Sequence, residues 1–362
     1  MKKLISSLLF LICLTVTFSA KAQFITPNET EKIVIERFEY IKNIKHFISD
    51  IYWKPYGIKD FEGTIVYFND SASYFINPLE SMKEKVSKYS IMLNDYSWNI
   101  WKLKLPFDSA FFVMETTFQY DKRAKWDINF NTPVLFCSSP ELTKKEKTEI
   151  KSTEEWSVAL MHELYHQYQY SNPAILAYVL RLYQEKKMID MDSLQGVYLS
   201  NKMMNDTIKM ENELLKKAYN STSLDEEKKL FKEFLKLRSQ RNLAYFKKKK
   251  FWLTTPEDFW EKMEGTCLMM ESVLKQNFNK IPIPEYLKNN DAMFKNDAPF
   301  ATYSAAQAVA DYTELDDKEP YVGTTGYNMV RLLEKHNVNY KDNFFNYASL
   351  PLALQLKYFY KI

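Results

Sequence analysis

The spacing of hydrophobic residues changes along the chain. Residues 29–52 carry isoleucine, valine and phenylalanine every three or four positions, which predicts an amphipathic helix. The spacing then shortens in two apolar runs, 61–68 and 73–77, which flank Asn69 and Asp70. Because asparagine and aspartate favour tight turns, these runs predict a β-hairpin.

Residues 83–103 return to a helical spacing and predict a second helix. Three later segments are rich in aromatic and β-branched residues, which suit a pleated sheet. They predict strands over 109–120, 125–130 and 133–138. With the hairpin, these segments predict a sheet of about four or five strands.

Beyond the last of these strands, the helical spacing dominates. Predicted helices span 174–188, 191–219, 223–249, 256–278 and 326–336. Within this part, residues 206–249 have heptad-like spacing, which favours a long helical hairpin packed inside the molecule. A coiled-coil dimer is the alternative for the same residues.

These elements predict an α+β fold: a small mixed sheet packed on one helix, followed by a mostly helical C-terminal lobe with a long helical insertion near residues 190–250. The sequence has no internal repeat and no clear linker, so we expect a single domain over residues 23–362. Its N-terminal part, 23–145, holds the first helix and the sheet, and its C-terminal part, 146–362, holds the remaining helices.

The first residues have the features of a secretory signal peptide. Two lysines precede an apolar stretch, and an Ala-Lys-Ala cleavage site ends at Ala22, before Gln23. We therefore expect removal of residues 1–22 and export to the periplasm or the cell exterior. The apolar stretch is shorter than the ~18–20 residues that span a bilayer, and no later segment is apolar enough to do so.

The amino-acid composition bears on which classes of partner the protein is expected to bind. The formal net charge is +3 with 26% charged residues, an ordinary balance that gives no reason to expect nucleic acid. Only 6 glycines are present, which favours long helices over flexible turns. The expected mature chain keeps Cys137 and Cys267, which either form a disulfide or remain buried thiols. The sequence leaves the oligomeric state open.

One short motif carries the strongest chemical signal. The chain has only 4 histidines, and two of them, His162 and His166, belong to a His-Glu-Leu-Tyr-His motif. Residues four apart share one face of a helix, so both imidazoles reach a single Zn²⁺. Glu163 then lies beside the metal, where it takes a proton from a metal-bound water. Ser152 and Glu155 form a capping box at the start of this helix.

The motif helix is apolar on nearly all sides, which predicts that it is buried. Two histidines and a carboxylate inside a buried helix are costly unless they have a partner, and a metal supplies one. We therefore expect one Zn²⁺ per chain and a metal-dependent hydrolase, with a peptidase as the leading interpretation.

A catalytic zinc takes three protein ligands and a water, so one ligand is missing from the motif. A later helix is predicted to begin with Thr255 as N-cap and Pro256 at its first position. On this helix Glu264, followed by a glycine and an apolar stretch, is the first candidate, with Glu261 and then Glu271 as alternatives. Glu271 is also a candidate to accept the N–H of a ligating histidine, and a solvated carboxylate is the equal alternative.

Together these motifs resemble the gluzincin branch of the zincin metallopeptidases. The resemblance covers roughly residues 130–345 and rests on HELYHQYQY (162–170), EGTCLMME (264–271) and YVGTTGYNMVRLLEKH (321–336). In that branch, the two motif histidines and a distal glutamate hold zinc, and the motif glutamate is the base. The resemblance also implies an edge strand that pairs with an extended peptide, and residues 133–138 stand in its place.

The long separation between His166 and Glu264 departs from the short-spaced members of that branch, and the helical insertion accounts for it. Peptide hydrolysis also needs a donor to the oxyanion that develops on the attacked carbonyl. Gluzincins often supply it from the C-terminal part, which makes Tyr321 and Tyr327 candidates, with His336 third.

The expected function is that of an exported zinc-dependent peptidase acting on a peptide or protein substrate. Two alternatives remain open. One is a zincin-like protein that has lost turnover and binds a partner, and the other is a zinc hydrolase that does not cleave peptides. Retention of Glu163 favours activity, because a binding site needs the histidines but not the base.

Overall fold

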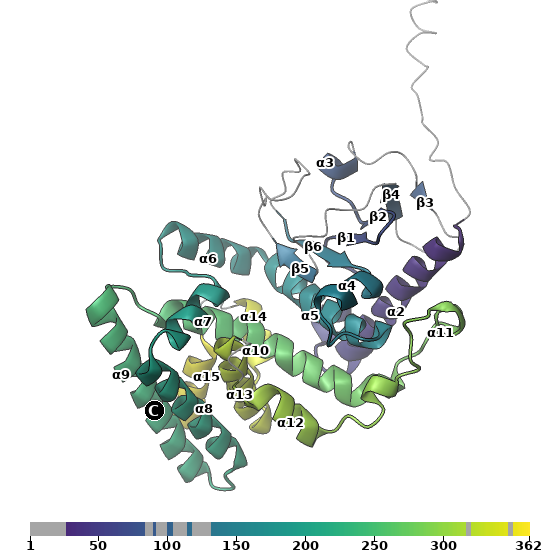
Figure 1. Cartoon of the computed structure of the whole chain (residues 1–362). Coiled ribbons are helices and arrows are strands. Elements are labelled where there is room, and N and C mark those ends of the chain that lie inside the picture. Colours follow the sequence, from purple (N-terminus) through teal and green to yellow (C-terminus); the bar gives the residue numbers. More distant parts are fainter. Residues whose placement is uncertain are drawn as a thin grey trace, which may run out of the picture.

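The computed structural model describes residues 27–83, 90–91, 100–103, 114–117, 132–315, 320–346 and 350–362. The described residues form a small mixed sheet, two helices beside it and a large helical lobe (Figure 1). This agrees with the expected α+β class and its helical C-terminal part. The predicted signal peptide and the predicted strand 125–130 lie outside the described residues.

The sheet contains six described strands in the order β3-β4-β2-β1-β6-β5. Their bounds are β1 (Thr64–Phe68), β2 (Ser73–Ile76), β3 (Ser90–Ile91), β4 (Ile100–Leu103), β5 (Met114–Thr117) and β6 (Val134–Ser138). Strands β1 and β6 are parallel, and the other neighbouring pairs are antiparallel.

The predicted hairpin is present as β1 and β2, with Phe68 opposite Ser73. Its turn is closed by Asn69. The backbone N–H of Asn69 donates to the carbonyl of Ala72, and its side-chain oxygen accepts from the N–H groups of Ser71 and Ala72. An asparagine side chain thus replaces a backbone acceptor within the turn, as its position between two apolar runs indicated.

Two sequence-based predictions about the sheet were wrong. The helix predicted over residues 83–103 is not continuous, because the described residues 90–91 and 100–103 are strands β3 and β4. Ile100 and Trp101 pair across the sheet with Ile76 and Phe75, and such cross-strand pairs stabilise a sheet whatever the local spacing suggests. Residues 133–138 do not form the edge, because β6 has β1 on one side and β5 on the other.

The helices of the described chain are α2 (Glu29–Ile51), α3 (Glu80–Lys83), α4 (Pro140–Glu146), α5 (Thr153–Ser171), α6 (Pro173–Gln184), α7 (Met191–Leu199), α8 (Lys202–Asn220), α9 (Leu224–Lys249), α10 (Thr254–Asn277), α11 (Glu285–Asn290), α12 (Ala305–Thr313), α13 (Tyr321–Lys335), α14 (Tyr340–Asn346) and α15 (Leu352–Tyr360). Every helix predicted after the motif has a counterpart. The predicted helix 191–219 is divided into α7 and α8. Within the described residues, no helix is both long and apolar enough to cross a membrane.

The sheet buries both of its faces. Alternate residues of β1 point in opposite directions, as the pleat requires. Ile65 and Tyr67 join the main core, which also contains Trp156 of α5, whereas Val66 and Phe68 form a smaller core on the other face. Helices α2 and α5 therefore pack on the main-core face, and α5 carries the histidine motif beneath the sheet (Figure 1).

Helices α8 and α9 pack side by side as the predicted intramolecular hairpin (Figure 1). Buried ion pairs join this hairpin to α10. Arg241 of α9 contacts Glu211 of α8 and Glu257 of α10, and Arg238 binds Glu261. The insertion is therefore attached to the helix that carries the predicted third ligand.

Candidate metal centre

The motif helix α5 begins as predicted. The Ser152 side chain accepts a hydrogen bond from the N–H of Glu155, and helical residues start at Thr153. The return bond of the capping box is displaced by one residue, because the Glu155 carboxylate accepts from the N–H of Lys151. From this start, His162 and His166 lie on the face of α5 that meets α10, where both contact Glu264.

Helix α10 approaches α13 closely because glycines meet at the crossing. A Cβ added to Gly265 would lie 2.3 Å from the carbonyl carbon of Gly326, and a Cβ added to Gly326 would lie 2.0 Å from the carbonyl oxygen of Glu261. The predicted N-cap is wrong, because α10 begins at Thr254 with Leu253 before it and no side-chain cap. The hydroxyl of Thr254 instead accepts from the amide of Asn242 on α9.

Three side chains from α5 and α10 converge. The Nε2 atoms of His162 and His166 are 3.0 Å apart. The Glu264 carboxylate lies across both of them, with Oε2 3.3 Å from Nε2 of His162 and Oε1 3.1 Å from Nε2 of His166. The structure therefore brings together the two histidines and the first-ranked candidate for the third ligand.

The other nitrogen of each imidazole has its own acceptor. Nδ1 of His162 lies 2.5 Å from Oε1 of Glu271, and Nδ1 of His166 lies 2.9 Å from Oε1 of Gln169. The Gln169 amide nitrogen donates to the Met263 carbonyl and to Thr266, which leaves its oxygen for His166. With a proton on each Nδ1, both imidazoles would present Nε2 to a metal, as ligating histidines do.

This donor set fits a zinc ion. In a tetrahedral site with ligand bonds of 2.0–2.1 Å, two ligand atoms are about 3.3 Å apart. The three separations in the cluster, 3.0, 3.1 and 3.3 Å, are close to that distance between ligand atoms. Without a cation, protons on the imidazoles would have to balance the Glu264 carboxylate. One carboxylate and two imidazoles are also a common ligand set for catalytic zinc.

The charges of the cluster are strongly coupled. Burial would raise the pKa of Glu264, but the adjacent His166 and His162 hold that pKa well below its ordinary value. Burial opposes protonation of His162, but hydrogen bonds to Glu264 and Glu271 raise its pKa well above its ordinary value. Protons and a metal cation therefore compete for the same nitrogens.

Cys267 is a neighbour that sequence reasoning did not assign to the site. His162, His166 and Cys267 offer ligand atoms within 4.8 Å of one another. The sulfur, however, lies 3.5 Å from Nδ1 of His166 and 3.8 Å from Nε2. A ligand that shares a metal with Nε2 must lie on the Nε2 side of the ring, so the geometry favours Glu264. Burial also raises the pKa of the Cys267 thiol to about 12, which disfavours the thiolate.

Cys267 and Cys137 are both buried free thiols, so the predicted disulfide alternative does not apply. The pattern on α10 contains a signal for Cys267, because Glu264, Cys267 and Glu271 follow one another at intervals of three and four residues and share a face. Gln169 likewise follows His166 by three residues.

Glu163 lies where the motif helix meets the edge strand. Its Oε2 atom accepts a hydrogen bond of 2.8 Å from the backbone N–H of Thr116 on β5. The Thr116 hydroxyl donates to the backbone carbonyl of Glu163 at 2.7 Å. Two bonds therefore fix the base candidate against β5, a contact that the sequence did not indicate.

The alternative ligand Glu261 has a different partner. Both of its oxygens accept from Nη1 of Arg238, at 2.7 and 2.8 Å. The structure thus directs Glu261 to the inserted hairpin and Glu264 to the histidines. The alternative for Glu271, a solvated carboxylate, does not hold, because that carboxylate contacts His162.

The oxyanion-donor candidates are spread over α13. The Tyr321 ring stacks on Tyr198 of α7, with ring centroids 6.2 Å apart. It lies two residues before Gly323, which faces Glu264, and therefore on the opposite side of the helix. Tyr327 donates to Ser272 of α10, the residue that follows Glu271.

His336 lies at the end of α13, where its Nε2 contacts Glu227 of α9 at 2.5 Å. A different tyrosine, Tyr312 of α12, donates directly to Glu271 at 2.8 Å. Its position could not be inferred from the sequence, because no motif surrounds it.

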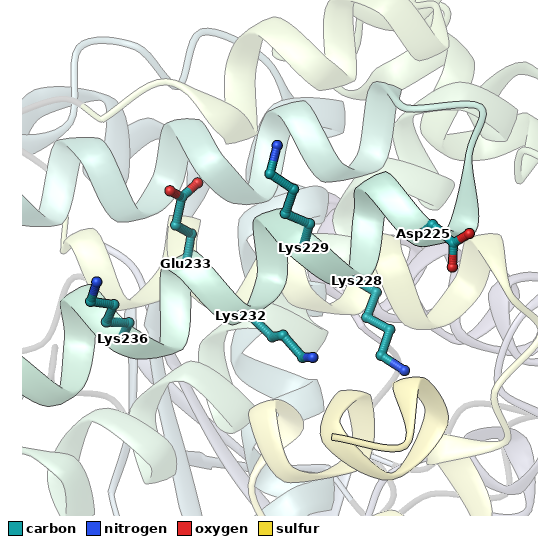
Figure 2. A pocket seen from close by; sticks show the side chains of 6 residues that line it. All are labelled: Asp225, Lys228, Lys229, Lys232, Glu233 and Lys236. Carbon is teal, nitrogen blue, oxygen red and sulfur yellow. The ribbon is translucent and has the colours of Figure 1, made fainter.

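A shallow hollow on α9 is lined only by charged side chains of that one helix. Figure 2 shows these residues pointing in different directions along the helix: Asp225, Lys228, Lys229, Lys232, Glu233 and Lys236. Lys229 also pairs with Glu226 at 3.7 Å. Because its charges are mixed and do not converge, this hollow has the character of a solvated helix face.

The chain was compared with protein-family models, with curated proteins and with solved structures. None of the three comparisons found a match.

Proposed function

We propose that this chain is an exported zinc-dependent peptidase. The observation that carries the proposal is that the Nε2 atoms of His162 and His166 both face the Glu264 carboxylate. These three residues would hold one Zn²⁺, and Glu271 and Gln169 would orient the imidazoles. Export is supported by the charged and apolar pattern of residues 1–22.

Bound zinc supplies a Lewis acid that polarises a peptide carbonyl and makes a water molecule more acidic. Glu163 is the group that handles the proton. Its carboxylate removes a proton from the attacking water and then delivers that proton to the nitrogen that leaves. The hydrogen bond from Thr116 restricts this carboxylate, so that it is already oriented before substrate binds.

The position of β5 favours a peptide over other substrates. In the described sheet, β5 is an edge strand that pairs only with β6. An extended peptide binds such an edge through main-chain hydrogen bonds. Because Thr116 of β5 contacts Glu163, a peptide added along this strand would lie beside the base. The edge strand expected of a peptidase is then β5 and not residues 133–138.

The test is metal analysis of the purified mature protein together with digestion of a broad peptide library. We expect one zinc per chain and cleavage by the wild type. Glu163→Gln should retain zinc and lose at least about a hundredfold in rate, because the base is not a ligand. Glu149→Gln, an exposed glutamate before α5, is the matched control and should remain active.

The outcomes separate the alternative functions. Zinc without cleavage of any peptide would support a zincin-like binding protein. Cleavage of a different bond class that still depends on Glu163 would support a non-peptidase zinc hydrolase. An active Glu163→Gln variant would show that the proposed mechanism is wrong.

A further inference from the structure

The two oxygens of Glu271 have different partners. Oε1 lies 2.5 Å from Nδ1 of His162, and Oε2 accepts a hydrogen bond of 2.8 Å from the Tyr312 hydroxyl. Lys275, one turn further along α10, places Nζ 3.7 Å from the same Oε2 and donates to the Tyr312 oxygen. One oxygen therefore serves the histidine, and the other is held by a tyrosine and a lysine.

Tyr312 is well fixed in its position. Only 8% of its surface is exposed, and its ring packs against Tyr327 with ring centroids 5.3 Å apart. The Lys275 ammonium donates a hydrogen bond to the Tyr312 hydroxyl oxygen, which leaves the hydroxyl proton for Glu271. The hydroxyl is thus a donor whose place is set by packing between α10, α12 and α13.

A carboxylate needs such a donor to keep one orientation. The last torsion of a glutamate side chain is broad and nearly two-fold, so it gives little preference by itself. The Tyr312 bond to Oε2 directs Oε1 toward His162. The Nδ1 atom of His162 then has a fixed acceptor, and its Nε2 is directed toward Glu264.

We propose that Tyr312, supported by Lys275, is a positioning residue of the metal centre that acts through Glu271 on His162. The inference rests on the proposed zinc site. It assigns a role to α12, a helix that contributes no ligand. It also explains why a lysine is present near a cation site: Lys275 contacts Tyr312 and Oε2 of Glu271, whereas His162 contacts Oε1.

The experiment measures the zinc Kd of the full mature chain by competition with a chromophoric chelator. Tyr312→Phe removes only the hydroxyl and should weaken zinc binding by about tenfold, the lower end of the effect of residues that orient ligands. Tyr303→Phe is the matched control. Its hydroxyl donates to Asp311 and its ring also lies near Lys275, so this variant should keep the wild-type Kd.

A double variant distinguishes positioning from general packing. If Tyr312 acts through Glu271, then Tyr312→Phe should add no further loss in a Glu271→Gln background. Additive losses, or an unchanged Kd in Tyr312→Phe, would overturn the inference. Failure of the wild type to bind zinc would instead contradict the proposed function.

The melting temperature of each metal-free variant shows whether it is folded. If Tyr312→Phe does not fold, Lys275→Met replaces it in the same cycle. Because Lys275 supports the same hydroxyl, we expect a smaller loss in zinc affinity that also vanishes in the Glu271→Gln background. An unchanged Kd for folded Lys275→Met would then overturn the inference.

Discussion

At the scale of single residues, the chemistry of this molecule depends on which nitrogen of each imidazole carries the proton. Glu271 and Gln169 lie within hydrogen-bond distance of the two Nδ1 atoms, which leaves the Nε2 atoms of His162 and His166 for a metal. His46 offers a comparison, because it is exposed, its Nε2 contacts Asp60 at 2.8 Å, and it lies outside this cluster.

This difference predicts the outcome of histidine replacement. His162→Ala and His166→Ala should each lose zinc at micromolar concentrations, because two protein ligands do not hold a catalytic zinc. His46→Ala should keep one zinc per chain. Elemental analysis after dialysis measures all three variants. Stoichiometric zinc in both site variants would contradict the assigned ligands.

At the scale of secondary structure elements, the site depends on how closely α10 approaches its neighbours. Gly265 and Gly326 let the backbones of α10 and α13 touch, and Glu264 immediately precedes Gly265. Any side chain at these positions would push α10 away from α13 and displace the ligand. Gly196 of α7 differs, because an added Cβ there meets nothing within 4 Å.

Replacement by alanine should therefore have one effect at Gly265 and Gly326 and the opposite effect at Gly196. Gly265→Ala and Gly326→Ala should each destabilise the fold by about 3 kcal/mol or more, because the obstructing atoms are backbone and cannot rotate away. Gly196→Ala should stabilise it by about 0.5–1 kcal/mol, since alanine favours an exposed helix. Urea unfolding measures each free energy. A mild effect at Gly265 would show that the two helices can separate easily.

A second element-scale feature is the buried charge cluster between the hairpin and α10. Two arginines face four carboxylates, so full ionisation would leave two excess negative charges. The members are Arg238, Arg241, Glu211, Glu257, Asp258 and Glu261. Burial raises the pKa of Glu261 to about 8 and that of Asp258 to about 6. Burial acts in the same direction on Glu257, but Arg241 and Arg238 lower its pKa to about 2.

These shifts predict a pH dependence with a definite sign. Between pH 5 and 8, Glu261 is protonated in the folded chain and ionised in the unfolded chain, so its contribution to stability falls as pH rises. The wild type should lose stability relative to Glu261→Gln over this range, by up to about 1.4 kcal/mol per pH unit. Urea unfolding at several pH values measures the difference. Parallel curves for the two proteins would mean that Glu261 stays ionised beside Arg238.

The helices and strands also show which structural features can be predicted from the sequence. Helix α5 and the β1–β2 hairpin follow from local signals: a serine cap, a turn asparagine and a sustained spacing. Strand β4 does not, because Ile100 and Trp101 are strand residues only through their partners on β2. The same distinction applies to the site. His162 and His166 belong to one local motif, whereas Gln169, Thr116 and Tyr312 gain their roles from contacts that no local pattern records.

At the scale of the whole molecule, the candidate metal centre joins the two parts of the fold. Helix α5 carries the histidines and packs under the sheet, whereas α10 carries Glu264 and binds the inserted hairpin through Glu261. A cation held by both helices would therefore tie the sheet to the helical lobe. Such a ligand stabilises the folded chain by mass action, by about 2.7 kcal/mol at a hundredfold excess over its Kd.

This arrangement predicts that chelation weakens the whole fold and not only the site. Removal of zinc by a chelator should lower the melting temperature of the wild type, in one cooperative transition followed by both tryptophan fluorescence and far-ultraviolet circular dichroism. The chelator should leave His166→Ala unchanged, because that variant holds no zinc to lose. If zinc leaves the wild type without any change in melting temperature, the centre does not connect α5 and α10. If the two signals give different melting temperatures, unfolding is not a single cooperative transition, and the cation does not tie the whole fold together.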